Sequence, residues 1–216
     1  MARRKEHTHG EIHDMAIKSV MQYLHIASLE SLSLRKVATD IGYAPSTLIN
    51  IFGSYQQLLL SVSEQVLIDL FEHLTSSTSD EINHNHSPIH ATEQAQASIE
   101  LMAHRYYQFA NEHRVCFKLV FELSAPEGVS LSSNHQQAID TLFSLVSEQL
   151  TALFPKADHA EIIMMSRVLW GGIHGLTCLG IDGKLFTDQT ALPAMLSSHV
   201  HGYLLGMTQE KDLSCC

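Results

Sequence analysis

The sequence predicts an all-α protein of about nine helices. Apolar residues recur in steps of three and four along most of the 216 residues, which is the period of one helix face. Alternating apolar and polar runs, which are typical of strands, are absent from the sequence. Apolar residues make up 45% of the chain and charged residues 17%, a composition typical of folded globular proteins. We therefore expect a helical protein with a sizeable core.

The first predicted helix occupies the N-terminal segment and ends near Ala27. Its apolar side chains fall on one stripe, which indicates a helix packed on the rest of a domain. The stripe consists of Ile12, Met15, Ala16, Val20, Tyr23 and Leu24.

Two short helices joined by a glycine follow, in the segment "LRKVATDIGYAPSTLINIF". Ser33 can cap the first of them, which spans residues 34–41. Gly42 ends it, because glycine adopts the left-handed conformation that a tight corner requires. Pro45 is suited to the first position of the next helix, which runs to Phe52.

The rest of the chain alternates long helical segments with polar or proline-containing breaks. A helix from Tyr55 to about Thr75 precedes the polar segment "TSSTSDEINHNHSP", which we interpret as a loop. We expect two domains, residues 1–54 and residues 55–216. Further helices are predicted at residues 90–111, 113–124, 131–154, 158–181 and 189–207.

The charge is divided unevenly along the chain. The net charge is −10, but the first 60 residues carry six basic and five acidic side chains, or about +1. The acidic excess therefore lies in the remainder. Attraction to phosphate decays over about 8 Å at physiological salt, so the local charge of the N-terminal part decides whether it can approach nucleic acid.

The sequence favours a cytoplasmic protein. No uninterrupted run of eighteen apolar residues is present, so we expect no membrane-spanning helix. No apolar signal segment follows the basic N-terminus. The four cysteines, Cys116, Cys178, Cys215 and Cys216, form no CxxC pair, which indicates a reducing compartment.

The two short helices match the plan of a helix-turn-helix, in which the second helix lies in the major groove of DNA. Residues 11–60 resemble the DNA-binding domain of the TetR (tetracycline repressor) family, in "SLSLRKVATDIGYAPSTLINIF" and in "GSYQQLL". The remaining helical and acidic residues are similar to the family's C-terminal ligand-binding and dimerisation domain. Within it, "LWGGIHGLTCLG" resembles a subtype named for Trp, His and Gly (WHG), here Trp170, His174 and Gly175.

Three positions depart from the family pattern. The resemblance implies a serine or threonine cap where this chain has Ala44, a tyrosine where it has Ile49, and a lysine where it has Tyr55. Each departure removes a polar or charged contact with phosphate. We therefore expect operator binding that is weaker or more sensitive to salt, unless the N-terminal arm compensates.

Nine residues are candidates for contact with DNA. Ser33 and Thr47 lie at helix starts, where a hydroxyl and backbone N–H groups bind phosphate oxygens. Asn50 can make a bidentate contact with adenine, and Ile49 can pack on a thymine methyl group. The arm at residues 3–5 either enters a minor groove or merely adds charge. The full set is Ser33, Arg35, Lys36, Pro45, Ser46, Thr47, Ile49, Asn50 and Tyr55.

Aromatic and methionine side chains recur at helical spacing in the C-terminal part. Residues in this pattern are usually core, while the resemblance implies that some of them line an effector cavity. The candidates for that cavity are Met102, Tyr106, Phe109, Phe117, Phe121, Phe143, Trp170 and His174.

An apolar seam on the predicted helix at residues 158–181 is a candidate dimer interface. Gly171, Gly172 and Gly175 allow another helix to approach closely, either within the subunit or across a two-fold axis. The seam consists of Ile162, Met165, Leu169, Ile173 and Leu176.

No cofactor and no metal ion is predicted. His84, His86 and His90 are close in sequence, but zinc needs three or four converging ligands and this polar segment has no cysteine nearby. We interpret the segment as a loop, with a metal site as the alternative. Catalytic Ser/His/Asp or Cys/His patterns at recognisable spacing and nucleotide-binding loops are absent from the sequence, so we expect no enzyme activity.

The resemblance implies a bacterial transcriptional regulator. We expect a homodimeric repressor that binds a palindromic double-stranded DNA operator and is released by a small, largely apolar ligand. Two alternatives remain: a helix-turn-helix protein that acts through protein contacts only, and a helical ligand carrier or enzyme.

Overall fold

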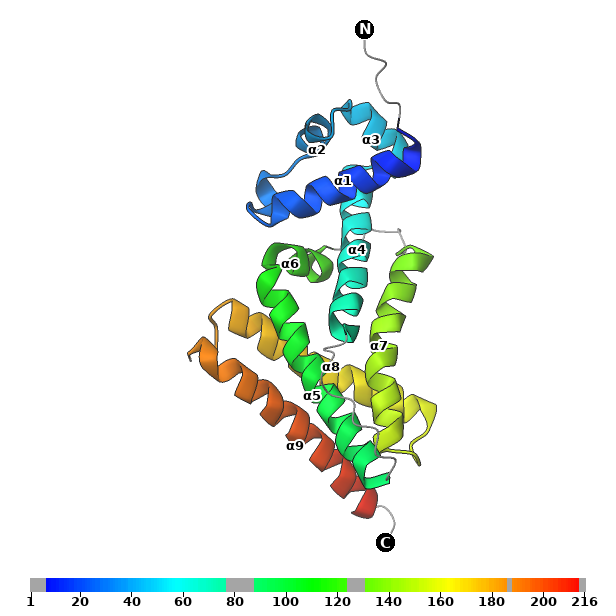
Figure 1. Ribbon diagram of the computed structural model, residues 1–216, viewed down its shortest axis with the longest axis vertical. Helices are drawn as coiled ribbons and strands as arrows, with labels where there is room; N and C mark the ends of the chain where they lie inside the picture. The colour runs from blue at the N-terminus through cyan, green and yellow to red at the C-terminus, as the bar shows by residue number, and fades with distance from the viewer. Residues whose placement is uncertain (1–6, 77–87, 124–130, 186–187, 214–216) are drawn as a thin grey trace. The chain divides into compact units, whose positions relative to one another are not determined.

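The computed structural model describes residues 7–76, 88–123, 131–185 and 188–213. These residues form nine α-helices and no strand, which confirms the predicted fold class (Figure 1). Two short 3₁₀ helices, η1 (Leu29–Ser31) and η2 (Gln189–Ala191), accompany them. The α-helices are α1 (His9–Leu24), α2 (Leu34–Asp40), α3 (Pro45–Phe52), α4 (Tyr55–Thr75), α5 (Pro88–Glu112), α6 (Arg114–Glu122), α7 (Ser133–Leu153), α8 (His159–Ile181) and α9 (Leu192–Leu213).

The short helices begin and end where local signals place them. The Ser33 hydroxyl accepts a hydrogen bond from the backbone N–H of Lys36 and caps α2. Gly42 has φ 77°, the left-handed conformation expected of the corner, and Pro45 is the first residue of α3. Gly53, which follows α3, also has positive φ, at 82°. Capping and backbone sterics therefore fix this segment locally.

Most predicted helix bounds differ from the structure by one to three residues, and the ends of α1 and α9 differ by three residues or more. α1 ends at Leu24 instead of Ala27, because the chain turns there and the N–H of Ala27 bonds back to the carbonyl of Tyr23 before η1 begins. α9 continues to Leu213, past the predicted end at residue 207. Its one proline, Pro193, lies in the first turn, and no positive-φ glycine interrupts the helix after it.

The helices pack as two units. The first unit comprises residues 1–69 and 113–138, so it contains α1–α3, most of α4, α6 and the start of α7. In it, α1 packs on α2, α3 and α6. The Ser19 hydroxyl of α1 donates a 2.7 Å hydrogen bond to the carboxylate of Asp40, which holds α2 on α1. The most buried apolar side chains include Ala16, Val20, Val37, Leu48, Leu58, Val62 and Phe117.

The second unit comprises residues 70–112 and 139–216. Helices α8 and α9 pack on each other, and α5 packs on both. A β-carbon at Gly172 would overlap the ring of His199, and one at Gly180 would overlap Leu192. Both glycines are therefore required for the close approach of α9. The expected functional boundary at residue 54 stays a prediction, since packing groups most of α4 with the N-terminal helices.

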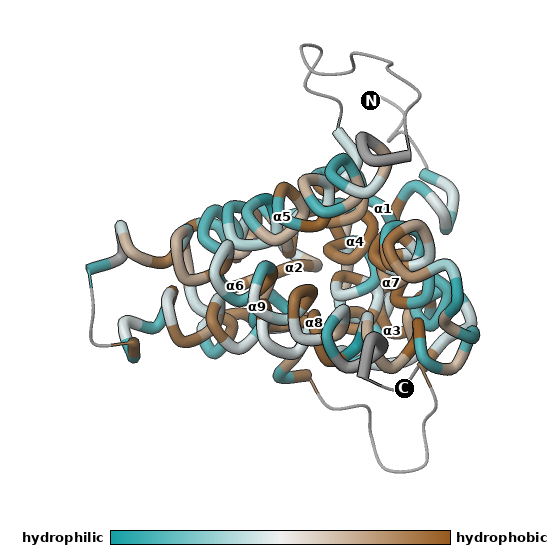
Figure 2. The backbone as a smooth tube through the Cα atoms, turned by 90° about the horizontal axis from the view of Figure 1, so that it is seen from below, coloured by the Kyte–Doolittle hydropathy of each residue, from teal (hydrophilic) through white to brown (hydrophobic). Residues whose placement is uncertain are grey.

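Helix α8 is long and apolar enough to cross a membrane by length and composition, although no membrane is part of the structure (Figure 2). The sequence expectation counted only uninterrupted apolar runs, whereas the apolar stretch of α8 contains Arg167. A helix in the interior of a folded protein meets the same criterion. Eight residues of α8 are buried inside the second unit, and among them are Ile162, Met165, Leu169 and Ile173.

Candidate functional site

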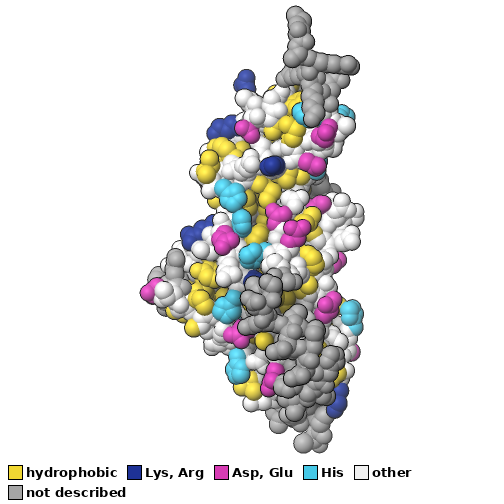
Figure 3. Space-filling view, in the orientation of Figure 1, with side chains coloured by type: hydrophobic (Ala, Val, Ile, Leu, Met, Phe, Trp, Pro, Cys, Tyr) yellow, Lys and Arg dark blue, Asp and Glu magenta, His cyan; other side chains and the backbone are white. Residues whose placement is uncertain are grey.

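The exposed face of α3 carries four of the nine predicted DNA-contacting residues. Leu48 is fully buried and anchors α3 to the unit, while Ile49 is 40% exposed. Ser46 and Asn50 are exposed on the same helix, as is Pro45 at its start. The short helix α3, held in place by Leu48, therefore exposes both polar and apolar side chains to solvent. Figure 3 shows Lys and Arg side chains on the surface of the N-terminal helices nearby.

The start of α3 has no side-chain cap. Ala44 occupies the capping position and makes no side-chain hydrogen bond. The backbone N–H of Thr47 bonds to the carbonyl of Ala44, and Thr47 itself is half-buried. Because Pro45 lacks an N–H, Ser46 supplies the first backbone donor of α3.

Arg35 and Lys36 of α2 are both exposed, but they differ in their contacts. The Lys36 ammonium donates hydrogen bonds to the Tyr23 hydroxyl, at 2.9 Å, and to the carbonyl of Ser31, at 2.6 Å. It also lies 5.1 Å from the centre of the Tyr23 ring. The hydrogen bond from Lys36, followed by that of Ser31, lowers the pKa of Tyr23. Lys36 therefore ties α2 to the end of α1, in a pocket of about 640 Å³ that Arg35 also lines.

Tyr55 is half-buried, and its contact with DNA stays a prediction. Its hydroxyl is buried and has no hydrogen-bond partner among the described residues. Burial, followed by the neighbouring Tyr23, raises the pKa of Tyr55. Tyr55 thus packs inside the first unit instead of presenting its hydroxyl to DNA.

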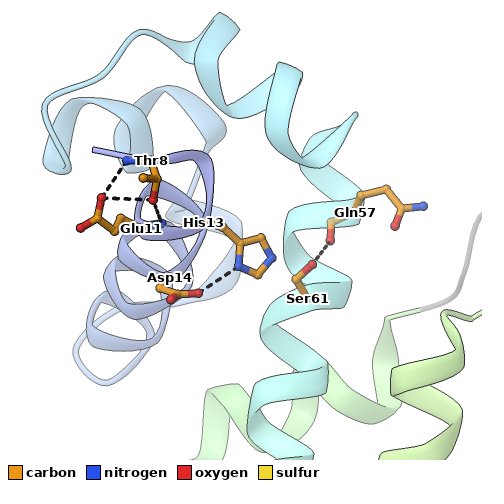
Figure 4. A network of polar contacts seen from close by, with 6 residues as sticks. All are labelled: Thr8, Glu11, His13, Asp14, Gln57 and Ser61. Carbon is orange, nitrogen blue, oxygen red and sulfur yellow. Dashed lines mark hydrogen bonds and ion pairs between the residues drawn. The ribbon is translucent and has the colours of Figure 1, made fainter. Parts of the chain in front are cut away.

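Two histidines near the N-terminus contact a residue just before α3 and the last residue of α3. His7 Nδ1 lies 2.7 Å from the Tyr43 hydroxyl, and the His13 ring stacks on Phe52 with ring centroids 4.8 Å apart. Thr8 and Glu11 form a reciprocal capping box at the start of α1, and His13 also contacts Asp14 (Figure 4). The T-x-x-E spacing was a sequence signal for this cap, whereas the stacking on Phe52 had none.

Four of the predicted cavity residues come together in the second unit. The Tyr106 hydroxyl of α5 lies 2.9 Å from His174 Nδ1 of α8. The Trp170 and His174 rings stack, with centroids 4.9 Å apart and an interplanar angle of 20°. Phe143 of α7 meets Trp170 edge-on at 5.6 Å. We call Tyr106, Phe143, Trp170 and His174 the α8 aromatic cluster.

The other predicted cavity residues lie elsewhere. Phe109 packs against His73 at 5.6 Å in the second unit, and Met102 is half-buried on α5. Phe117 and Phe121 belong to the first unit, where their rings lie 5.0 Å apart. Their role in an effector cavity stays a prediction.

Burial sets the protonation states in the α8 aromatic cluster. Burial raises the pKa of Tyr106, although a hydrogen bond from Trp170 opposes the shift. Burial lowers the pKa of His174, so its imidazole is neutral at neutral pH. Cys178, one turn after His174, places its sulfur 3.4 Å from His174 Nε2. The i, i+4 spacing of His174 and Cys178 was the one sequence signal for this last contact.

The residues of the predicted dimer seam pack mostly within the subunit, and their role at a dimer contact stays a prediction. Ile162, Met165, Leu169 and Ile173 are at most 6% exposed inside the second unit, and Leu176 is half-buried. The opposite side of α8 is the open one, and neither Gly171 nor Gly175 has any atom near its would-be β-carbon. Gly172 and Gly180 thus lie on the side of α8 that packs on α9, whereas Gly171 and Gly175 lie on its open face. The exposed apolar residues of that face are Ile163, Met164, Val168 and Leu179.

Three predictions fall outside the described residues. They concern the arm at residues 3–5, the histidines at positions 84 and 86, and the side chain of His90. Among the residues that are described, no group of three His, Cys, Asp or Glu side chains is placed to hold a metal ion.

The sequence and the fold are both similar to those of known proteins. Residues 99–203 match the family model described as the tetracyclin repressor-like C-terminal domain. No curated protein matches the chain. A protein of unknown function from Rhodococcus sp. RHA1 has a similar structure, with a TM-score of 0.68, 16% identity, and coverage of 95% of this chain and 98% of that one.

Two other similar structures are described as transcriptional regulators. A tetR-family transcriptional regulator from Streptomyces coelicolor has a TM-score of 0.64 and 15% identity, over 95% of this chain and 85% of that one. A TetR transcriptional regulator from Rhodococcus sp. RHA1 has a TM-score of 0.58 and 13% identity, over 89% of this chain and 95% of that one. At these identities the likeness is one of fold.

Proposed function

The chain belongs to the TetR family of transcriptional regulators, and on that premise we propose that it is a sequence-specific DNA-binding repressor. One observation carries the proposal: α3 is anchored by the buried Leu48 and presents Ser46, Ile49 and Asn50 outward. A helix of a helix-turn-helix that enters the major groove reads bases through such exposed side chains.

The side chains of α3 suit direct readout of base edges. An asparagine amide makes a bidentate contact with adenine, and an apolar side chain packs on a thymine methyl group. Asn50 and Ile49 are the exposed residues that supply these two chemistries. Ser33 and Arg35 at the start of α2 supply phosphate contacts, which set the register of the helix on the duplex.

The protein acts as a homodimer in this proposal, and it meets a palindromic operator with two copies of α3 about 34–36 Å apart. The open face of α8 supports a two-fold contact, because exposed apolar side chains flank Gly171 and Gly175. An open stripe of small side chains on α9 extends it. These residues recur every fourth position and are exposed: Ala194, Ser198, Gly202 and Gly206.

A small, largely apolar ligand in the second unit relieves repression in this proposal. The α8 aromatic cluster joins α5, α7 and α8, so a ligand bound against it contacts three helices. Operator affinity then falls by as much as the ligand's differential affinity for the two states of the dimer. A protein with this role works in the cytoplasm.

A gel-shift experiment with the DNA upstream of the protein's own gene, at two salt concentrations, tests the proposal. We expect a shift at low salt that weakens steeply as salt rises, because phosphate contacts release counterions. If no fragment of the source genome shifts at low salt, the repressor function is wrong. The helix-turn-helix would then act through protein contacts, which the exposed Ile49 and the buried Tyr55 hydroxyl favour.

A further inference from the structure

A pocket of about 640 Å³ lies between α1 and α2 in the first unit. All the residues that line it fall between positions 19 and 40, so the pocket is formed within one unit. Small molecules bind in protein clefts of about 300–1,000 Å³. We call this feature the α1–α2 pocket, and its volume is that of a site for a small molecule.

Part of the lining of the α1–α2 pocket is apolar. Leu32 and Val37 are 7% and 1% exposed, so they offer a fixed apolar surface. Ile26, which follows α1, is 87% exposed, the highest value among the large apolar side chains that the structure describes. A ligand with an apolar body that rests on Leu32 and Val37 would remove Ile26 from water, which favours binding.

Two cationic side chains line the same pocket, and both keep N–H groups for a ligand. The Lys36 ammonium has three N–H donors, of which the Tyr23 hydroxyl and the Ser31 carbonyl use two. These two bonds hold the ammonium in place before a ligand arrives. The guanidinium of Arg35 has no hydrogen-bond or ion-pair partner among the described residues.

The charge of the pocket favours a ligand with one anionic group. Asp40 also lines the pocket, and its carboxylate accepts the 2.7 Å hydrogen bond from Ser19. Arg35 and Lys36 against Asp40 leave an excess of one positive charge. A guanidinium binds the two oxygens of a carboxylate through two parallel N–H groups, and this geometry suits Arg35.

A phosphate of the DNA backbone would use only part of the α1–α2 pocket. Phosphate contacts are made by cationic and hydroxyl groups, which Arg35 and Ser33 supply in the proposed function. Such a contact leaves the apolar lining at Ile26 and Leu32 without a role. A molecule that carries both a carboxylate and an apolar body uses the two kinds of lining together.

We propose that the α1–α2 pocket binds small carboxylic acids with an apolar body, either aromatic or aliphatic. The carboxylate pairs with the Arg35 guanidinium and accepts the remaining N–H of Lys36. The apolar body rests on Leu32 and Val37 and covers Ile26. This site lies in the first unit, so it is separate from a ligand bound against the α8 aromatic cluster.

A ligand in this pocket competes with DNA for Arg35. This consequence rests on the proposed function, in which Arg35 contacts phosphate, whereas the binding of the ligand does not. Where ligand and DNA exclude each other, ligand at ten times its dissociation constant weakens DNA binding by up to about tenfold.

Protein-observed NMR of the full chain, with labelled isoleucine δ1 methyl groups, tests the binding. The probes are 2-naphthoate and octanoate, and Ile26→Val identifies the signal of Ile26. We expect the Ile26 methyl signal to shift saturably with both probes, with dissociation constants of about 1 mM or lower. Acetate lacks the apolar body and naphthalene-2-carboxamide lacks the charge, so each should bind at least about tenfold more weakly.

Two results of this titration would overturn the site. One is an Ile26 signal that shifts with neither probe up to about 10 mM. The other is a control compound that binds as tightly as the probes. Isoleucine signals of the second unit report separately on any binding at the α8 aromatic cluster.

Two matched variants test the role of the cation. Arg35 and Arg114 are both exposed in the first unit, but only Arg35 lines the pocket. We expect Arg35→Met to weaken the binding of 2-naphthoate at Ile26 by about tenfold or more, and Arg114→Met to leave it unchanged. The Arg35 side chain has no polar partner to lose, so this variant should fold. Equal affinities of Arg35→Met and wild type would overturn the proposal.

The competition is measured on a DNA fragment that the protein binds at low salt. At ten times its dissociation constant, 2-naphthoate should weaken DNA binding of the wild type by up to about tenfold and of Arg35→Met much less. A ligand that acts from the second unit would weaken both proteins alike, and that result overturns the competition. If the wild type binds no DNA, the proposed repressor function fails, while the NMR titration still decides the pocket.

Discussion

The imidazole of His199 in α9 lies directly against the α-carbon of Gly172 in α8, so that any β-carbon at position 172 would overlap the ring. His199 Nε2 also approaches the carbonyl of Leu169 at 3.3 Å. The packing of α8 on α9 therefore depends on the absence of a side chain at position 172, as it does at position 180.

Gly172→Ala should destabilise the protein by about 1–3 kcal/mol, because His199 must move and lose its contact with the Leu169 carbonyl. Denaturant unfolding measures the change. Gly10→Ala is the matched control, since Gly10 lies in α1 with open space around it and should cost nothing. Equal stability of Gly172→Ala and wild type would contradict the packing of α8 on α9.

Asn50→Ala should cost about 1–3 kcal/mol of operator affinity at one base-pair position and relax specificity there. Binding to operator variants changed one base pair at a time locates the effect. Asn111→Ala, at an exposed asparagine of α5, is the control and should leave operator affinity unchanged. An Asn50→Ala protein with unchanged affinity and specificity would show that Asn50 does not read a base.

Arg35→Met and Lys36→Met should differ, although the two residues are neighbours on α2. The Lys36 ammonium is hydrogen-bonded to Tyr23 and Ser31, whereas Arg35 is directed to phosphate in our proposal. We expect Arg35→Met to reduce the slope of log affinity against log salt by about one, and Lys36→Met to change it less. Anisotropy titrations over a series of salt concentrations give both slopes. Equal reductions would mean that Lys36 leaves Tyr23 when DNA binds.

Stability should fall on mild acidification. Burial lowers the pKa values of His135 and His174 below the ordinary 6.5, while the unfolded chain keeps the ordinary value. As pH falls through about 6.5, the unfolded state takes up protons that the folded state does not, so the free energy of unfolding decreases. This loss levels off below the folded pKa values. Unfolding measured from about pH 8 to about pH 5 tests it, and His135→Gln should flatten the dependence. An equally steep dependence in His135→Gln would contradict the burial of this side chain.

Val168→Glu should convert a dimer to a monomer, because Val168 is 51% exposed on the open face of α8 that we propose as the two-fold contact. A buried charge without a partner is strongly unfavourable at such an interface. Sedimentation velocity gives the mass in solution. Leu101→Glu is the control, since Leu101 is 47% exposed on α5 and should leave the dimer intact. A dimer that survives Val168→Glu would place the interface elsewhere.

The helices were predictable because their signals are local. Ser33, Gly42 and Pro45 act through caps and backbone sterics, and these need no knowledge of the tertiary fold. Which side of α8 is buried was not predictable in the same way. The buried side of α8, with Met165 and Leu169, and its open side, with Met164 and Val168, are both apolar at helical spacing. Periodicity finds a helix here but does not decide which side is covered.

The candidate sites also differ in whether local sequence signals or tertiary packing places their residues. The exposed side of α3 was predicted, because Leu48 and the flanking glycine corner fix which face is inward. The buried hydroxyl of Tyr55 was not, since its position depends on packing within the first unit. The α8 aromatic cluster depends on Tyr106, which lies 68 residues from His174 along the sequence. Contacts of that separation are set by the tertiary structure alone.

Footprinting of the wild-type protein and of Asn50→Ala on genomic DNA fragments at low salt tests most directly whether α3 reads DNA. We expect the wild-type protein to protect a palindromic site whose half-sites are one helical turn apart, about 10 base pairs or a multiple of that, and Asn50→Ala to protect it more weakly and less selectively. Absence of any protected site for the wild-type protein would contradict the claim that α3 reads DNA.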